Sequence, residues 1–200
     1  MNKLTLTLTL SLSLSLSLAR IAVITETWLR DGPELDDLKQ DLAQGSGLGM
    51  ITKNRRPCPN EVSYRGVAIL WQEGQCRLKE YKIKNTEYFE VLVCAGTLKG
   101  HSRKICVMAY YLTPNLQAAR ARLALEYIAD VVTDLKRNFT DTFIMLAGDF
   151  NQWKVGDGLA DLPDLKEADV GPTRNGKKID RIFSNVSRSI TASGTLEPLD

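Results

Sequence analysis

Asp149 and Asn151 directly follow an apolar run in the stretch LAGDFNQW. Residues 142–147, TFIMLA, have the composition of a strand that is buried on both faces, and Gly148 is expected to let the backbone turn after it. Loops at strand ends are held by a rigid sheet, and binding and catalytic groups collect there. A side-chain period of two then directs the carboxylate and the amide to one site and Phe150 into the core. The alternative is a strand end with an ordinary Asx turn.

Three other side chains with chemical potential occupy similar places in the sequence. Glu26 follows the apolar run IAVIT, Tyr111 follows ICVMAY, and Asp180 lies inside IDRIF. Each is separately explicable as a turn or surface residue. Together they form an ordered series of carboxylate, phenol and amide groups at predicted strand ends.

In this order, the segments ITETWL, YLTP, GDFN and PTRNGKKIDRIFSN resemble the motifs of the endonuclease/exonuclease/phosphatase family. They are most similar to the endonuclease domains of non-LTR (LINE-type) retrotransposons. The resemblance runs from about Ile21 to Asp200. It implies a DNase I-like fold, which is a two-layered β-sandwich flanked by helices. It also implies an enzyme that hydrolyses phosphodiesters of DNA with Mg²⁺ or Mn²⁺.

The resemblance also implies roles for individual residues. Glu26 matches the metal-binding glutamate, which suits a hard cation that prefers carboxylate oxygen. Asp149 matches the aspartate that activates or orients the attacking water. Tyr111 matches a tyrosine that donates a hydrogen bond to a phosphate oxygen, although Tyr110 is a rival for that position.

Further roles concern the phosphate and the nucleic acid. Asn151 matches the amide that positions the phosphate and the catalytic aspartate, and Asp180 matches the aspartate that orients a catalytic histidine. Arg174 is expected to contact the phosphate backbone, or else to be a turn residue. Trp28 and Trp153 would suit base stacking, and the alternative is that both are core or rim aromatics.

Two departures from the family pattern lower the expected activity. The late serine–aspartate–histidine motif is absent, and the single histidine, His101, lies in the polar stretch KGHSRK, where an exposed turn is expected. The family's first asparagine motif is also absent from residues 4–18. The domain is therefore expected to be incomplete at its C-terminus and its N-terminus, and weakly active or inactive.

The pattern of apolar runs predicts an α+β fold with largely antiparallel strands. One helix is predicted from Pro33 to Ala43, and a second from Leu116 to about Arg137, with Asn115 as its N-cap. Gly45, Gly47 and Gly49 are expected to form a loop. Strands are predicted at residues 21–25, 67–71, 77–83, 88–98, 104–111, 142–147 and 179–185.

Composition and charge place few limits on function. The chain has 200 residues, 44% of them hydrophobic, and a net charge of +2, so a nucleic-acid partner is neither required nor excluded. The four cysteines form no CxxC pair, which argues against a zinc site. Cys94 and Cys106 lie in apolar strands and are expected to be reduced core residues in an intracellular protein, nuclear or cytoplasmic.

Residues 1–20 form a low-complexity segment in which leucine alternates with threonine or serine, and residues 21–200 form the predicted domain. A signal peptide is the alternative for this segment. However, half of the residues in its apolar stretch are serine or threonine, and no small-x-small cleavage site is clear. It is too short and polar for a transmembrane helix. Neither a membrane nor a protein partner is implied.

Three functional hypotheses remain open from the sequence. The first is a metal-dependent DNA endonuclease of retroelement type. The second is a phosphatase or phospholipase of the same fold that acts on a small phosphoester. The third is a non-catalytic remnant that serves as a binding module.

Overall fold

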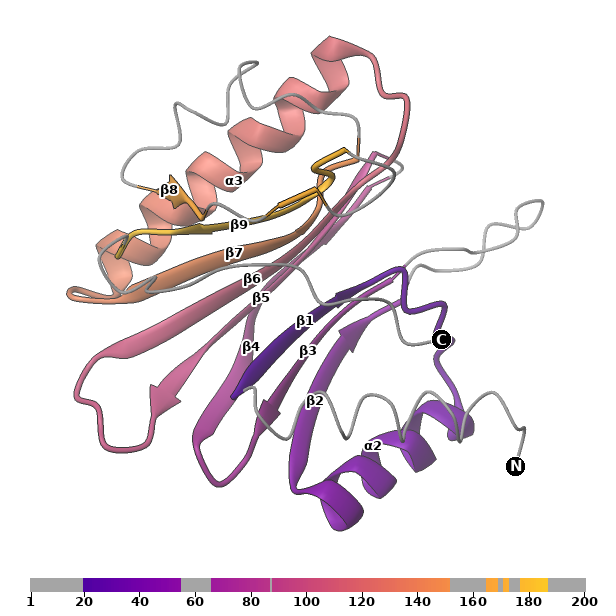
Figure 1. Cartoon of the computed structure of the whole chain (residues 1–200), viewed down its shortest axis with the longest axis vertical. Helices are drawn as coiled ribbons and strands as arrows, with labels where there is room; N and C mark the ends of the chain where they lie inside the picture. The colour runs from indigo at the N-terminus through magenta and orange to yellow at the C-terminus, as the bar shows by residue number, and fades with distance from the viewer. Residues whose placement is uncertain are drawn as a thin grey trace.

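The strands of the computed structural model form two sheets (Figure 1), and the structure describes residues 20–54, 66–86, 88–151, 165–168, 171–172 and 177–186. One sheet has the order β1-β3-β2 and the other the order β4-β5-β6-β7-β9-β8. The strands are β1 Ile21–Thr25, β2 Leu48–Lys53, β3 Val67–Gln72, β4 Cys76–Asn85, β5 Phe89–Leu98, β6 Lys104–Leu112, β7 Phe143–Asp149, β8 Lys166–Glu167 and β9 Asp180–Ser184, and the helices are α2 Pro33–Ser46 and α3 Ala118–Asn138.

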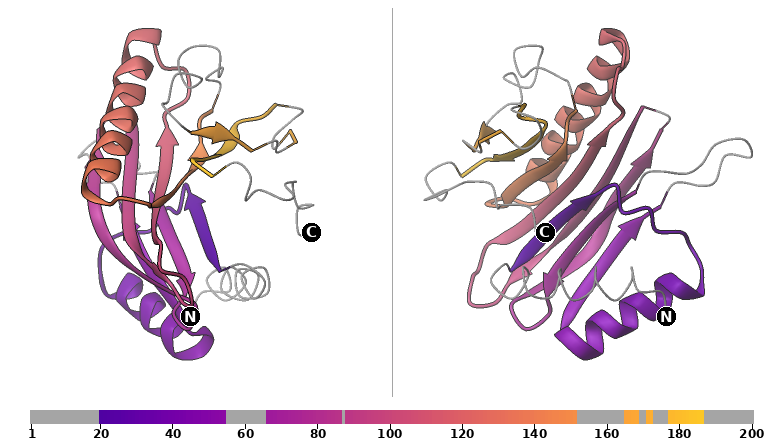
Figure 2. Two further views of the ribbon diagram at one scale, coloured as in Figure 1. Left: turned by 90° about the vertical axis from the view of Figure 1, so that its left-hand side faces the viewer. Right: turned by 45° about the vertical axis from the view of Figure 1, so that its right-hand side comes forward.

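The two sheets pack face to face, and each has a helix on its outer face (Figure 2). The core between the sheets includes Ile69 of β3, Leu92 of β5 and Val107 of β6, all fully buried. A second core lies between the six-stranded sheet and α3, and a smaller one lies between the three-stranded sheet and α2. The predicted α+β class, a two-layered sandwich flanked by helices, is confirmed.

Every strand pair is antiparallel except β6 and β7, among the described residues. A parallel pair needs a crossover connection, and α3 provides it. The carboxyl ends of β6 and β7 therefore meet at one edge of the sheet, where Tyr111 lies opposite Asp149. This connection places two of the predicted site residues side by side.

The predicted loop at Gly45, Gly47 and Gly49 is wrong. Gly45 lies in α2, Gly47 ends that helix in the left-handed conformation with φ 62°, and Gly49 lies within β2. A Cβ on Gly49 would lie 2.3 Å from the indole ring of Trp71, its partner on β3. Glycine in this strand therefore admits a neighbouring aromatic ring and does not indicate a turn.

The predicted start of the second helix is also wrong. Asn115 has φ 58°, and the residue that precedes the first turn of α3 is Gln117, with no side-chain cap hydrogen bond. The predicted strands and the first helix are observed with ends shifted by at most a few residues, whereas β2 and β8 were not predicted.

The prediction that Cys94 and Cys106 are core residues without a disulfide is confirmed, since both are free and fully buried. Burial raises the pKa of each thiol to about 12. Neither described helix has the length and hydropathy of a membrane-spanning helix. Residues 1–19, nearly all of the low-complexity segment, lie outside the described residues.

Candidate active site

Three predicted catalytic residues lie in one row across the larger sheet. Tyr111 at the end of β6 pairs with Asp149 at the end of β7, and Asp149 pairs with Asp180 at the start of β9. Side chains that face each other across adjacent strands lie on the same face of a sheet, with neighbouring Cβ atoms about 5 Å apart. Tyr111 and Asp149 are buried, whereas Asp180 is exposed. The row therefore runs from the core to the surface.

Glu26 reaches this row from the other sheet. It follows β1, is exposed, and accepts a hydrogen bond of 3.0 Å at Oε1 from Oη of Tyr111. Its backbone has φ 52°, a left-handed conformation that is strained for a non-glycine residue. Residues 85 positions apart in the sequence are thus joined at one end of the sandwich.

The alternation of side chains along β6 places Tyr111, and not Tyr110, on the face that contacts Glu26. Tyr110 is fully buried in the core beneath α3, on the opposite face from Glu26. Its hydroxyl has no hydrogen-bond partner among the described residues, and burial raises its pKa. Tyr111 is therefore the tyrosine of the candidate site.

The segment after β7 is a turn that fixes the carboxylate of Asp149. Asn151 has φ 51°, so the extended backbone on which its predicted orientation depended is interrupted. Its backbone N–H donates to Oδ1 of Asp149 at 2.6 Å, which is an Asx turn. Its side-chain amide donates to the carbonyl oxygen of Leu112. The amide is therefore attached to β6, and the carboxylate of Asp149 is fixed by the turn.

Gly148 and Phe150, the sequence neighbours of Asp149, both help to fix its position. A Cβ on Gly148 would lie 1.8 Å from the carbonyl oxygen of Tyr110, so glycine here permits the close approach of β7 to β6. Gly148 lies within β7, and the predicted turn at this residue is wrong. Phe150 is fully buried as predicted, with its ring centroid 4.8 Å from that of Tyr110 and 5.6 Å from that of Phe183.

Sequence reasoning missed Glu90, which extends the row onto β5. It pairs with Tyr111 across the β5–β6 ladder and is 0% exposed. Glu90 is the carboxylate in an otherwise apolar part of β5, FEVLV. The turn at residues 99–103 fixes the register of β5 and β6, which puts Glu90 beside Tyr111. Counting residue pairs along the two strands from that turn would have identified Glu90 from the sequence.

Some predicted residues are not part of the described site. Trp153 and Arg174 lie outside the described residues. His101 is exposed in the turn between β5 and β6, as predicted. Because β6 leads from this turn to Tyr111 with a rise of about 3.3 Å per residue, the only imidazole of the chain lies more than ~20 Å from the site.

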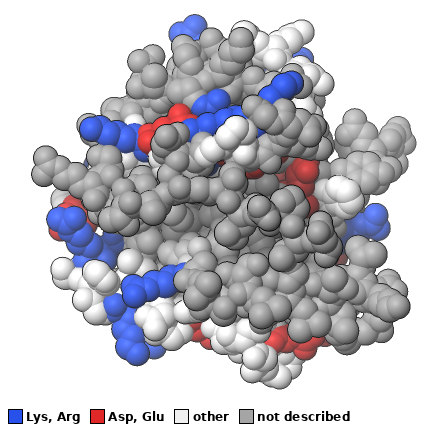
Figure 3. Space-filling model, in the orientation of Figure 1, with Lys and Arg blue, Asp and Glu red and all other residues white. Residues whose placement is uncertain are grey.

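The distribution of charge on one face of the molecule is mixed (Figure 3). Described lysine and arginine side chains lie at its upper, left and lower left parts, with acidic side chains beside several of them. Among the described ion pairs, Glu167 lies 3.0 Å from Lys178 and 3.5 Å from Arg181. The described residues therefore form no single basic patch on this face.

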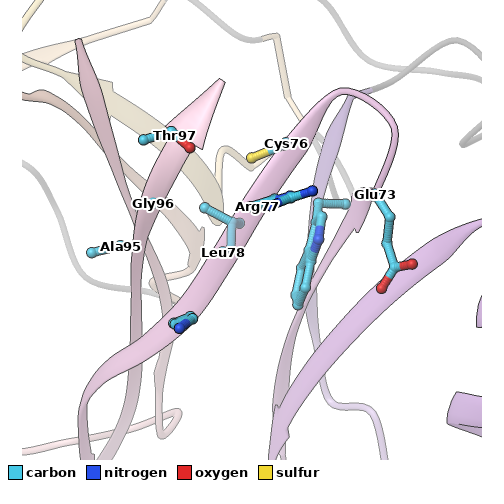
Figure 4. Close-up of a pocket in the computed structure, with 9 residues that line it drawn as sticks. Glu73, Cys76, Arg77, Leu78, Ala95, Gly96 and Thr97 are labelled. Carbon is cyan, nitrogen blue, oxygen red and sulfur yellow. The ribbon is translucent and has the colours of Figure 1, made fainter. Parts of the chain in front are cut away.

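A cavity of about 680 Å³ lies at the other end of the sandwich and is separate from this site. Figure 4 shows it between the end of β3, the start of β4 and the end of β5, with Cys76, Arg77 and Thr97 in its lining. Because β5 begins near Glu90 and ends near Thr97, the cavity and the row are separated by the length of that strand.

Comparison with known proteins identifies the fold. No protein-family model and no curated protein matches the sequence. The human Nocturnin catalytic domain with a bound sulfate anion is similar with a TM-score of 0.65 and 15% identity, over 90% of this chain and 74% of that chain. A Bacteroides thetaiotaomicron protein of the endonuclease/exonuclease/phosphatase family has a TM-score of 0.64 and 12% identity, over 88% and 71%.

A third similar structure is D. rerio TDP2 complexed with a single-strand DNA product, with a TM-score of 0.60 and 14% identity, over 92% of this chain and 78% of that chain. At such identities the likeness concerns the fold. The chain therefore has the two-layered DNase I-like fold of these endonuclease/exonuclease/phosphatase proteins.

Proposed function

We propose that this chain is a metal-dependent phosphodiester hydrolase, a DNA endonuclease of retroelement type with low activity. The observation that carries this proposal is the convergence of Glu26, Tyr111, Asp149 and Asp180 on one end of the sandwich. They come one from each of the four segments that resemble the family's motifs, and the fold brings them together from both sheets.

The residues of the site fit a hard divalent cation. Glu26 offers an exposed carboxylate, and Mg²⁺ in proteins commonly takes one or two carboxylates, several waters and the substrate phosphate. In the described part of the chain, no group of three histidine, cysteine or acidic side chains could hold a metal ion by itself, so water and the substrate would have to supply further ligands. A bound Mg²⁺ or Mn²⁺ would stabilise negative charge on the phosphate oxygens.

The other residues have separate tasks in the proposed reaction. Asp149, fixed by the Asx turn, orients the attacking water and accepts its proton. Tyr111 holds Glu26 and can redirect its hydroxyl to a phosphate oxygen. Asn151 positions the phosphate with a side-chain amide that is attached to β6, on a backbone that is strained. These groups are placed in advance, which is what lowers a barrier by electrostatic stabilisation.

DNA is favoured over a small phosphoester by the exposed position of Glu26 and Asp180 at the rim of the sandwich. A polymer can pass across such a rim, whereas small substrates generally occupy enclosed pockets. The segments ITETWL and PTRNGKKIDRIF support the retroelement branch, and the similar TDP2 structure holds a DNA product.

Low activity follows from the position of the single histidine. His101 lies at the other end of β6, so Asp180 has no imidazole of this chain to orient. When residues act together in catalysis, the effects of removing them on the rate are not additive, and the loss of one alone lowers the rate by orders of magnitude. Residual hydrolysis would depend on the metal, Asp149 and Tyr111.

The test is nicking of a supercoiled plasmid with Mg²⁺ by the wild-type chain and by Glu26→Gln and Asp149→Asn. We expect slow nicking that EDTA and either substitution abolishes. Asp130→Asn, an exposed carboxylate on α3, is the matched control and should nick like the wild type. Hydrolysis of p-nitrophenyl phosphate without any nicking would instead favour a phosphatase.

A further inference from the structure

Trp28 is the most exposed of the large hydrophobic side chains in the described part of the chain. Its exposed fraction is 61%, whereas the described Trp71 is 8% exposed in the core. It lies two residues after Glu26, so their Cα atoms are at most about 7 Å apart. Of the predicted alternatives, a core aromatic is therefore wrong for Trp28 and a rim aromatic is not, and its backbone lies near the proposed metal ligand.

The exposure of Trp28 does not result from a loosely attached loop. Thr27 donates from its backbone N–H to the carbonyl oxygen of Gly66 at 3.2 Å, at the entry to β3. Asn54 after β2 donates from Nδ2 to Oδ1 of Asp31 at 2.9 Å. Segment 26–31 is thus attached to the three-stranded sheet on both sides of Trp28.

Asn54 is itself firmly placed. It is 3% exposed, and its Oδ1 accepts a hydrogen bond of 3.0 Å from the hydroxyl of Thr52. A buried amide with satisfied groups is an effective anchor, because breaking either hydrogen bond leaves a polar atom unsolvated. The anchor therefore fixes the backbone that carries Trp28.

This arrangement opposes stability in two ways. Trp28 has φ 52°, a conformation that is strained for a non-glycine residue, and its indole forgoes most of the stabilisation that burial of apolar surface provides. Strain and exposed aromatic surface that persist in an anchored segment point to a ligand with an apolar, flat face. Next to a phosphodiester site, the group of that kind is a nucleobase.

We propose that Trp28 is a stacking platform for an unpaired base adjacent to the scissile phosphate, and that Asn54 is its positioning residue. The inference rests on the proposed phosphodiesterase function and makes it specific for nucleic acid with single-stranded character. Stacking uses the π-face that every base has, so it selects a strand with bases over a sugar phosphate without fixing a sequence.

The first experiment measures binding, so that it does not depend on turnover. Anisotropy of a short fluorescein-labelled single strand is recorded with Mg²⁺ for Asp149→Asn alone and together with Trp28→Ala, Trp28→Phe or Leu123→Ala. Leu123 is a matched control, since it is 57% exposed on α3. We expect Trp28→Ala to weaken binding about tenfold, Trp28→Phe less, and Leu123→Ala not at all.

An abasic strand of the same length separates stacking from other effects. With it, Trp28→Ala should bind like the parent, because the stacking partner is gone. Equal losses on ordinary and abasic strands, or no loss on either, would overturn the proposal. A wild-type chain that nicks plasmid while Trp28→Ala binds and nicks normally would refute the stacking role alone. Absence of any binding or nicking would refute the proposed function as well.

The role of Asn54 is tested by asking whether the effects of substituting Asn54 and Trp28 on KM are additive. In oligonucleotide cleavage, Trp28→Ala and Asn54→Ala should each raise KM with little change in kcat, and the double variant should be no worse than either single variant. Additive losses would show that Asn54 does not act through Trp28. Cleavage of methyl p-nitrophenyl phosphate, which carries no base, should be unchanged in Trp28→Ala, and a parallel loss there would also contradict stacking.

Discussion

Oη of Tyr111 donates a hydrogen bond of 3.0 Å to Oε1 of Glu26, and this bond joins the end of β6 in one sheet to the segment after β1 in the other. Tyr111 is 3% exposed and Glu26 is exposed, so the bond runs from the core to the surface. It orients a carboxylate that would otherwise rotate freely in solvent. The relative placement of the two sheets and the geometry of the proposed metal ligand therefore depend on each other.

Tyr111→Phe should lower nicking at a fixed low Mg²⁺ concentration about tenfold, because Glu26 loses its orienting donor while the ring and its packing remain. The free energy of unfolding should fall by roughly 1–2 kcal/mol, the lower part of the range for a hydrogen bond to a charged group, because Glu26 is exposed to solvent. Titration of nicking against Mg²⁺, together with urea denaturation, measures both effects. An unchanged Mg²⁺ dependence would contradict the proposed orienting role.

Glu90→Gln should retain the fold and impair cleavage. The side chain keeps its shape but loses its carboxyl group, in a position that is 0% exposed and opposite Tyr111. Since buried groups around a site act at low dielectric, we expect kcat to fall about tenfold while far-UV circular dichroism stays the same. Glu80→Gln, an exposed position on β4, serves as the control. Wild-type kcat in Glu90→Gln would show that this carboxylate has no part in the site.

Gly49→Ala and Gly45→Ala should change stability in opposite directions. At Gly49 the new Cβ would lie 2.3 Å from the ring of Trp71, so the free energy of unfolding should fall by about 1–3 kcal/mol. At Gly45, within α2, nothing lies within 4 Å, and alanine should raise it by about 0.5–1 kcal/mol. Thermal or urea denaturation of the two variants measures these changes. Equal changes in the free energy of unfolding would contradict the packing of the Trp71 ring against Gly49.

The buried thiols should make stability fall at alkaline pH. Burial raises the pKa of Cys94 and of Cys106 to about 12, whereas an unfolded thiol titrates near about 8.5. The unfolded chain therefore releases protons that the folded chain retains, and stability is lost as pH rises above about 8.5. Urea denaturation at pH 7 and pH 10 should show the loss, and it should be smaller in the double variant Cys94→Ala, Cys106→Ala. An identical pH dependence in that variant would contradict the burial of the thiols.

The sequence predicted most strands of this fold because apolar, β-branched runs end abruptly at polar residues. Residues at strand ends, in segments that resemble known motifs, also predicted the members of the candidate row, whose catalytic role stays a prediction. It could not predict β2, because Gly49 has the local signature of a loop and is compatible with a strand only once the ring of Trp71 is in place. Tertiary contacts of this kind override local propensity.

The candidate site shows the same limit at single residues. The choice between Tyr110 and Tyr111 required the face of β6, and the role of Glu90 required the register between β5 and β6. The left-handed conformation of Asn151 replaced the extended geometry from which its orientation had been inferred. Each of these depends on pairing between segments distant in the sequence, which no local pattern contains.

The most direct measurement compares plasmid nicking by this chain with nicking by a version extended by a strand that carries serine, aspartate and histidine, with Asp149→Asn made in both. The extended protein should nick with Mg²⁺ at a rate orders of magnitude above the slow rate of the chain, and Asp149→Asn should abolish both activities. If both proteins fold and neither nicks, or if nicking persists without Asp149, the assignment of a phosphodiesterase site to this row is contradicted.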